Sequence, residues 1–162
     1  MTQIQIVPYD ACYRSQVVHL ALRAWTGVLD RTAEEVPDFV FDAFYPDGWR
    51  VRQRYDVGDL LDTEPHNVWV AQADRVVVGF IGLRVRPEDR MGEIAIIAVD
   101  PDHQRRGIAK RMMLFAEKHF SALGLSMVMV ETIGGSAHLP ARRIYETFGF
   151  EQWPVARYFK KL

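Results

Sequence analysis

The stretch of sequence that decides the fold runs from residue 94 to residue 109 and reads IAIIAVDPDHQRRGIA. Its first six residues are apolar, which predicts a strand covered on both faces. Apolar side chains then recur at helical spacing between Gln104 and Leu123, where we expect a long helix stopped by Gly124. The stretch therefore predicts a buried strand, a polar turn containing Gly107 and a helix.

The start of this helix has the chemistry of an anion site. The first turn of a helix carries unpaired N–H groups and the positive end of the helix dipole, which suit a pyrophosphate. Gly107 permits close approach of the backbone, and the small Ala109 keeps the next turn open. Positive charge is added by Arg105, Arg106, Lys110 and Arg111. The alternative is a surface helix with ordinary basic residues, since the phosphate motifs of P-loop and Rossmann proteins are absent.

Upstream of this stretch, the pattern predicts a short strand at 3–7, an amphipathic helix at 13–29 and two further helical segments. The second helix would start at Thr32 as its N-cap, and the third would reach about Asp62. A hairpin follows, with strands at 68–73 and 76–85 around a tight turn at Asp74-Arg75. The next strand is expected at 93–99.

Downstream, a buried strand is expected at 127–132 and a helix at 137–148, while residues 150–159 can supply one or two closing strands. This order of elements is typical of a mixed α/β sheet with helices on both faces.

The composition describes an ordinary globular chain of 162 residues, 49% hydrophobic and 25% charged, which fits one domain over residues 1–162. The single cysteine, Cys12, is compatible with a reducing compartment, and we find no signal peptide or membrane-spanning stretch, so we expect a cytoplasmic protein without membrane contact. A net charge of −1 argues against nucleic-acid binding. No histidine cluster has metal-ligand spacing, so no metal is predicted.

Two motifs resemble the signatures of the GNAT superfamily of N-acetyltransferases. Residues 104–109, QRRGIA, match the pattern Gln/Arg-x-x-Gly-x-Gly/Ala, and they follow a buried strand as they do in that family. Residues 141–150, ARRIYETFGF, match a second pattern, Ala-x-x-x-Tyr-x-x-x-Gly-Phe. The resemblance covers residues 66–152 as a cofactor-binding core, whereas residues 8–65 match only as a variable helical region on the acceptor side.

The resemblance implies an α/β fold of the α+β type, with a mixed, largely antiparallel sheet of six to seven strands and helices on both faces. Acetyl-CoA would lie where the strands at 93–99 and 127–132 splay apart. Its pantetheine arm would pair with the backbone of Ile97, Ala98 and Val99. Its pyrophosphate would rest on the amides of the segment formed by Gln104, Arg105, Arg106, Gly107, Ile108, Ala109 and Lys110. A homodimer is compatible with the resemblance.

Three residues are candidates for catalysis. By resemblance, Tyr145 is the general acid beside the CoA sulfur, and Glu93 is the base that deprotonates the amine, directly or through water. Burial among apolar neighbours would raise the pKa of Glu93, but it can equally pair with Arg84 or Arg86. His138 stands where many family members carry an asparagine that contacts the cofactor, and it can bond similarly or act as acid or base.

The charge layout suggests the class of acceptor. Residues 30–64 carry a net charge of −6 and residues 100–162 a net charge of +4. An acidic pocket with aromatic residues, including Trp25, Tyr45 and Tyr158, would favour a small cationic amine through charge and cation–π attraction. The alternatives are acetylation of a protein N-terminus or lysine, and an acyl-CoA sensor without turnover.

Overall fold

The computed structural model describes residues 3–162, which divide into two compact units. The first unit holds residues up to Ala24 and the segment Gln53–Glu131, and the second holds Trp25–Arg52 and Thr132–Leu162. That the two units form one acetyltransferase domain stays a prediction. Among the described residues, no helix combines the length and the apolar character needed to cross a bilayer.

The first unit is built on a sheet that, within residues 3–162, has five strands in the order β1-β2-β3-β4-β5. The strands are β1 (Ile4–Pro8), β2 (Val68–Ala73), β3 (Val76–Arg86), β4 (Met91–Val99) and β5 (Met127–Val130). Neighbours from β1 to β4 pair antiparallel, and only β4 and β5 pair parallel. The mixed, largely antiparallel sheet is thus confirmed, although with fewer strands than the six to seven expected.

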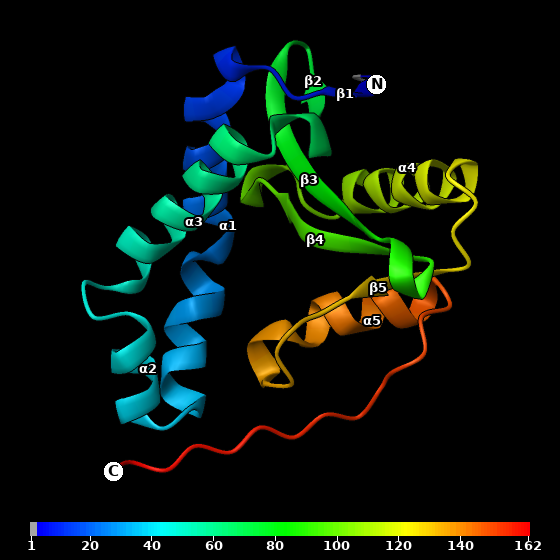
Figure 1. Cartoon of the computed structure of the whole chain (residues 1–162). Coiled ribbons are helices and arrows are strands. Elements are labelled where there is room, and N and C mark those ends of the chain that lie inside the picture. The colour runs from blue at the N-terminus through cyan, green and yellow to red at the C-terminus, as the bar shows by residue number, and fades with distance from the viewer. Residues whose placement is uncertain (1–2) are drawn as a thin grey trace. The chain divides into compact units, whose positions relative to one another are not determined.

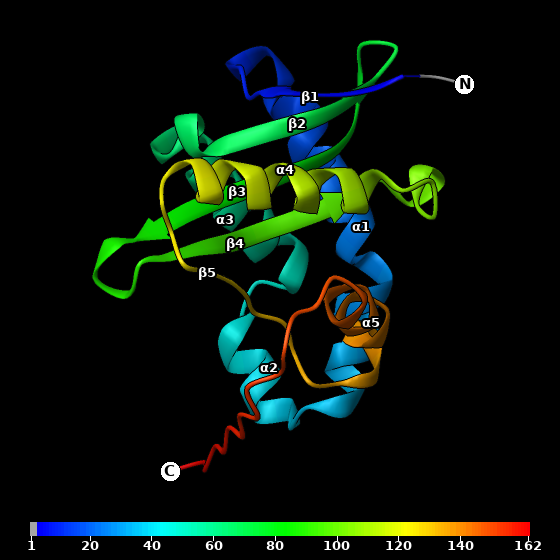
Figure 2. The same ribbon diagram turned by 90° about the vertical axis from the view of Figure 1, so that its right-hand side faces the viewer.

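The helices of the chain are α1 (Arg14–Glu35), α2 (Asp38–Phe44), α3 (Trp49–Thr63), α4 (Ile108–Ala122) and α5 (Leu139–Thr147). In the first unit, α4 crosses one face of the sheet, and the parts of α1 and α3 that belong to this unit cover the other (Figures 1 and 2). Two glycines of β3 mark the two faces: a Cβ at Gly79 would meet Met112 and Ile108 of α4, whereas one at Gly82 would meet Leu60 of α3. Helices therefore cover both faces, as predicted.

The core of the first unit lies between these layers. From α4, the side chains of Ile108, Met112, Met113, Ala116 and Phe120 are buried against the sheet. From the other side, α1 contributes Val17 and Leu20, and α3 contributes Val57 and Leu61. The apolar stripe that the sequence showed on the long helix is thus its sheet-facing side.

The turn between β2 and β3 confirms the predicted hairpin. Asp74 and Arg75 both have left-handed backbone conformations, with φ of 49° and 68°. Two consecutive residues of this kind define the type I′ turn, whose twist matches that of paired strands.

Three expectations differ from the structure. Thr32 does not begin a helix, because its hydroxyl donates to the carbonyl of Val28 inside α1, which continues to Glu35, and α2 begins only after Pro37. The long helix begins at Ile108 rather than at Gln104. Residues 150–159 form no strand, and Trp153 and Tyr158 in this segment are 86% and 91% exposed.

Gly92 allows α4 to approach β4, and this contact can be tested. A Cβ at Gly92 would overlap the ring of the buried Phe120, so Gly92→Ala forces side chains or backbone to shift. We expect Gly92→Ala to lower the free energy of unfolding by about 1–3 kcal/mol, the usual cost of overpacking. Urea denaturation measures this change.

Gly27→Ala is the matched control, because Gly27 lies inside α1 and an added Cβ would meet nothing within 4 Å. Alanine there should leave the stability unchanged or raise it, since glycine is the poorer helix former. Equal stability of Gly92→Ala and the parent would show that the sheet and α4 are not in tight contact at this point.

Candidate functional site

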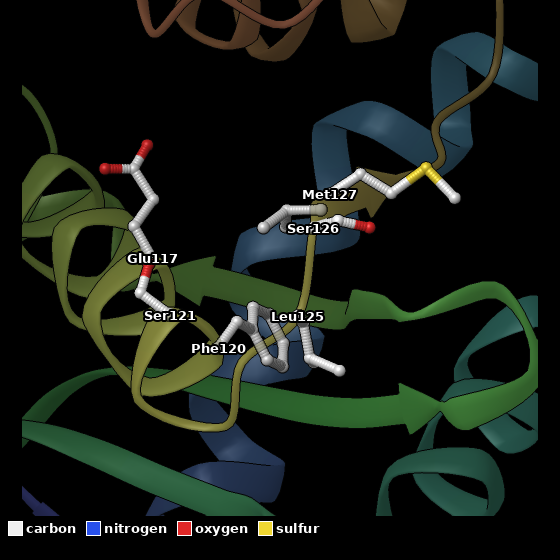
Figure 3. Close-up of a pocket in the computed structure, with 7 residues that line it drawn as sticks. Glu117, Phe120, Ser121, Leu125, Ser126 and Met127 are labelled. Carbon is white, nitrogen blue, oxygen red and sulfur yellow. The ribbon is translucent and has the colours of Figure 1, made fainter.

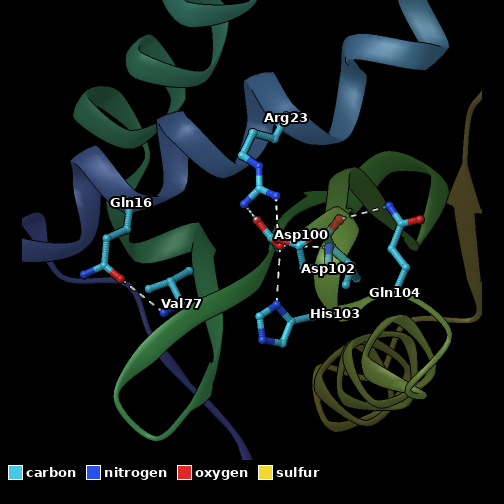
Figure 4. Close-up of polar contacts among 8 residues, drawn as sticks. Gln16, Arg23, Val77, Asp100, Asp102, His103 and Gln104 are labelled. Carbon is cyan, nitrogen blue, oxygen red and sulfur yellow. Dashed lines mark hydrogen bonds and ion pairs between the residues drawn. The ribbon is translucent and has the colours of Figure 1, made fainter.

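The turn that joins β4 to α4 is the first part of the candidate site. It begins with Asp100, whose side chain accepts a hydrogen bond from the N–H of Asp102 at 3.0 Å, and continues through a short 3-10 turn at Pro101–His103. The side chain of Gln104 donates to the carbonyl of Val99 at 3.2 Å (Figure 4). These bonds tie the turn to the end of the strand that precedes it.

The end of the turn presents the first amides of α4. Gly107 caps the helix with φ of 77°, a conformation that favours glycine, and its carbonyl accepts the N–H of Arg111 at 3.0 Å. The N–H groups of Ile108, Ala109 and Lys110 precede that first helical bond and have no acceptor within the helix. Exposed cationic side chains surround them, namely Arg105, Arg106 and Lys110. The start of α4 therefore combines free amides with positive charge, and the binding of an anion there stays a prediction.

The edge of β4 that faces β5 is open along its second half. β5 pairs with β4 only from Met91 to Ile94, whereas β3 pairs with β4 as far as Val99. Within the described part of the chain, residues 95–99, including Ile97, Ala98 and Val99, thus have a strand neighbour on one side only. This is the predicted divergence of the two strands, and it leaves peptide groups free to pair with an extended ligand.

Glu93 lies on β4 and is paired with a cation. The Nε and Nη2 atoms of Arg86 both lie 2.8 Å from one carboxylate oxygen of Glu93, whose side chain is 14% exposed. Of the two readings the sequence left open, the ion pair is the one observed. The Glu93 carboxylate is thus held by Arg86 and largely covered by its neighbours.

His138 belongs to the second unit and contacts Thr132. Its Nδ1 lies 2.7 Å from the Thr132 hydroxyl oxygen, while its Nε2 is buried and has no hydrogen-bond partner among the described residues. Burial, aided by the positive charge of Arg142, lowers the pKa of His138, and Glu35 opposes this only in part. The imidazole is therefore neutral at neutral pH, with one ring nitrogen left for a further bond.

The loop that carries His138 is held from two sides within the second unit. The carboxylate of Glu35 accepts from the backbone N–H of Ser136 at 2.8 Å and from its hydroxyl. Arg142 of α5 donates to the carbonyls of Ile133 and Gly135. The loop contains the glycine pair at 134–135, and the side chains of Glu35 and Arg142 hold it in place through these hydrogen bonds.

Tyr145 lies in the middle of α5, also in the second unit. Its ring packs on Phe150 with centroids 6.0 Å apart, and burial raises the pKa of its phenol above the ordinary value of 10.0. The side chain thus stays protonated at neutral pH. The catalytic candidates consequently divide between the units, with Glu93 in the first and Tyr145 and His138 in the second.

The aromatic residues assigned to an acceptor pocket have different surroundings. Tyr45 follows α2 and packs on Phe41 at 4.7 Å between centroids, Trp25 is half-buried in α1, and Tyr158 is almost fully exposed. Trp49 is buried, its indole N–H donates to Asp30 at 3.0 Å, and the guanidinium of Arg50 covers its ring at 4.2 Å. Trp49 is therefore part of the core of the second unit.

Several contacts of the site were not predicted from the sequence. Arg23 of α1 bonds to Asp100 and Asp102 at the start of the turn, and the Glu35–Ser136 pair fixes the His138 loop. The Asp-x-Asp spacing after a strand does signal a local side-chain turn. No local signal could identify Arg23, which is 77 residues away from Asp100.

A separate groove of about 220 Å³ lies between the end of α4 and the start of β5 (Figure 3). It is lined by Glu117, Phe120, Ser121, Leu125, Ser126, Met127 and Val128. None of the predicted site residues lines it. Among residues 3–162, no group of three His, Cys, Asp or Glu side chains is arranged so that it could hold a metal ion.

Comparison with known proteins places the chain in a family. Residues 31–150 match the model of the acetyltransferase (GNAT) family. A mycothiol acetyltransferase of Thermomonospora curvata is 32% identical over 92 residues, which cover 57% of this chain and 30% of that protein. One of Actinosynnema mirum is 34% identical over 95 residues, covering 59% of this chain and 31% of that protein. The match thus spans about a third of the length of these relatives.

Solved structures show the same fold at low identity. A GNAT-family acetyltransferase of Staphylococcus aureus Mu50 superposes with a TM-score of 0.70 at 18% identity, covering 99% of this chain and 94% of that one. The aminoglycoside N-acetyltransferase AAC(6')-Iy in complex with CoA gives 0.66 at 16% identity, with 99% and 96% covered. Since the family model matches most of the sequence and the fold agrees with it, this chain belongs to the GNAT family of acetyltransferases.

Proposed function

We propose that this protein transfers an acetyl group from acetyl-CoA to a primary amine of a small cationic molecule. The observation that carries the proposal is the open edge of β4 at residues 95–99, which leads directly into the amides at the start of α4. A ligand with an extended amide chain that ends in a pyrophosphate matches this open strand edge and the amides that follow it. Relatives named as acetyltransferases, and a fold neighbour solved with CoA, support the same donor.

The residues fit acetyl-CoA both along the open edge of β4 and at the start of α4. Peptide groups of Ile97, Ala98 and Val99 would pair with the pantetheine arm as an added strand would. The amides of the segment 105–110 would receive the pyrophosphate, with Arg105, Arg106 and Lys110 adding charge. Gly107 suits this position, because nothing lies within 4 Å of where its Cβ would be and the backbone is open to a ligand.

In the proposed reaction, the amine nitrogen bonds to the thioester carbonyl carbon and the C–S bond breaks. Glu93 takes a proton from the ammonium, directly or through water, and Tyr145 gives a proton to the departing sulfur. The Arg86 pair holds the Glu93 carboxylate in place, and burial supports the protonated state of Tyr145. The nitrogen of the adduct loses its second proton to the Tyr145 phenolate, which restores the phenol, Glu93 returns its proton to solvent, and CoA leaves as a thiol.

The charge of the second unit supports a cationic acceptor. Residues 25–52 contain six acidic and three basic side chains. Glu34, Asp38, Asp42 and Asp47 are exposed, while Asp30 and Glu35 are held by Trp49 and Ser136. Cation–π contact with the acceptor is assigned, as before, to Trp25, Tyr45 and Tyr158; the ring of Trp49 is already covered by Arg50.

Thiol release from acetyl-CoA across a panel of polyamines, aminoglycosides, amino acids and short peptides tests the function. We expect turnover with cationic small molecules. Tyr145→Phe and Glu93→Gln should each lower kcat by roughly 100-fold, the lower end of the range for a lost general acid or base.

Matched controls are available for both variants. Tyr55→Phe removes a hydroxyl from a tyrosine that is 69% exposed, and Glu64→Gln neutralises another carboxylate paired with an arginine, Arg84. Both should turn over like the parent. Turnover confined to peptides would contradict the cationic small-molecule acceptor, and CoA binding without any thiol release would favour the sensor.

The neutral imidazole of His138 supports a hydrogen-bonding role rather than an acid role for this residue. Because its folded-state pKa lies below the ordinary 6.5, the unfolded chain binds the proton first as the pH falls. We therefore expect the free energy of unfolding to decline as the pH falls from 6.5 towards the folded-state value, and to be insensitive to His138 above 6.5.

Thermal unfolding from about pH 5 to about pH 8 measures this dependence. His138→Gln should flatten the acid side of the profile, whereas His66→Gln, at an exposed histidine, should leave it unchanged. The same slope in His138→Gln and the parent would contradict the lowered pKa.

A further inference from the structure

Two carboxylates stand at the start of the turn that presents the α4 amides. Asp100 is buried, with 7% of its surface exposed, and Asp102 is exposed. Negative charge at this place opposes an anionic ligand on the same turn. The turn therefore needs a cation that belongs to the fold, besides the cations that would face the ligand.

Arg23 of α1 supplies that cation. Its Nη1 donates to Asp100 at 2.7 Å and its Nη2 to Asp102 at 2.7 Å, so that one guanidinium bridges both carboxylates (Figure 4). The planar fork of arginine fixes both partners, which lysine cannot do. The pair also holds the pKa of Asp102 below its usual range, mainly through the hydrogen bond from Arg23.

The rest of the turn is tied to the sheet through Asp100. Its N–H donates to the carbonyl of Val78 on β3 at 2.9 Å, and its own carbonyl accepts the N–H of His103 at 2.8 Å. A cavity of about 200 Å³ lies beside Arg23, between α1 and the β2–β3 hairpin and turn, so packing alone does not hold the turn against the helix. The bridge from Arg23 is the polar link from α1 to the turn.

The turn also carries conformational cost. Arg105 has a left-handed backbone, with φ of 60°, and Gly107 follows with φ of 77°. A non-glycine residue in this region persists where its surroundings hold it. Fixing Asp100 and Asp102 from α1 restrains the chain a few residues ahead of this point.

We infer that Arg23 is a positioning residue for acetyl-CoA binding. It fixes the β4–α4 turn through Asp100 and Asp102 and offsets one of their two negative charges, so that the α4 amides meet the pyrophosphate in a set geometry and against a weaker opposing field. The inference rests on the proposed placement of the donor on this turn.

Arg23→Met tests it, because methionine keeps much of the length and loses the charge and the fork. We expect the Kd for CoA, measured by calorimetry, and the KM for acetyl-CoA to rise about tenfold. This is the lower end of the loss in affinity seen when a residue that orients a metal ligand is removed, and Arg23 would orient the binding turn in a comparable way. kcat should stay within about twofold, since Arg23 is not among the groups that move protons. Arg23→Lys should fall between Arg23→Met and the parent.

Arg14→Met is the matched control. Arg14 lies on the same helix and binds Asp62 through Nε and Nη2 at 2.9 and 2.8 Å, but it does not touch the turn. CoA affinity should be unchanged in Arg14→Met. Adding Asp102→Asn to Arg23→Met should restore part of the affinity, because it removes a charge left unpaired.

A phosphate-free donor separates positioning from general damage. With S-acetylpantetheine, Arg23→Met should show the same KM as the parent, whereas a collapsed site would raise it for both donors. Equal CoA affinity in Arg23→Met and Arg14→Met would overturn the inference.

A variant in the turn itself distinguishes the two proposals. Gly107→Val places a branched side chain at a left-handed position beside the amides, and it should weaken CoA binding if the pyrophosphate lies there. Weaker binding in Gly107→Val with no change in Arg23→Met would overturn only the role of Arg23. No change in either variant would overturn the placement of the donor.

Discussion

The close seating of α4 on the sheet is the contact on which the rest of the first unit depends. Near the start of the helix, Ile108 and Met112 lie over Gly79, where a Cβ would come within 3.3 and 3.1 Å of them. Near its end, Phe120 fills the space above Gly92. Because interiors are packed as densely as crystals, a helix fitted at both ends has little freedom to slide. Its first amides are thereby fixed against the end of β4.

Local chemistry explains which parts of this architecture could be predicted. Continuous apolar residues identify β4, the apolar side of Ile108, Met112, Phe115 and Ala116 identifies α4, and a two-residue turn identifies the hairpin. These features depend on neighbours within a few positions, as the family motifs do. The anion site followed from the same local signals, a strand, a glycine and a helix start.

The parts that could not be predicted depend on distant partners or on competition between similar local states. Thr32 satisfies the pattern of an N-cap. In the structure, however, α1 continues past it to Glu35, and its hydroxyl donates to the carbonyl of Val28 within that helix. Arg84 lies directly opposite Glu93 in the β3–β4 register, yet it pairs with Glu64, and Glu93 pairs with Arg86 instead. The bridge from Arg23 joins segments 77 residues apart. In residues 150–159, β-prone composition is present without a strand.

At Arg105, stability and binding make opposite demands on one residue, because its backbone is left-handed and its side chain is a cation of the proposed phosphate site. An L residue with a side chain in this conformation costs roughly 1–2 kcal/mol, which glycine would avoid and asparagine would reduce. Selection for thermal robustness alone would thus replace this arginine, and the replacement would remove a cation from the proposed phosphate site. Stabilising substitutions at this position would meet a trade-off, because a residue poorly suited to its backbone is one that the proposed ligand would need.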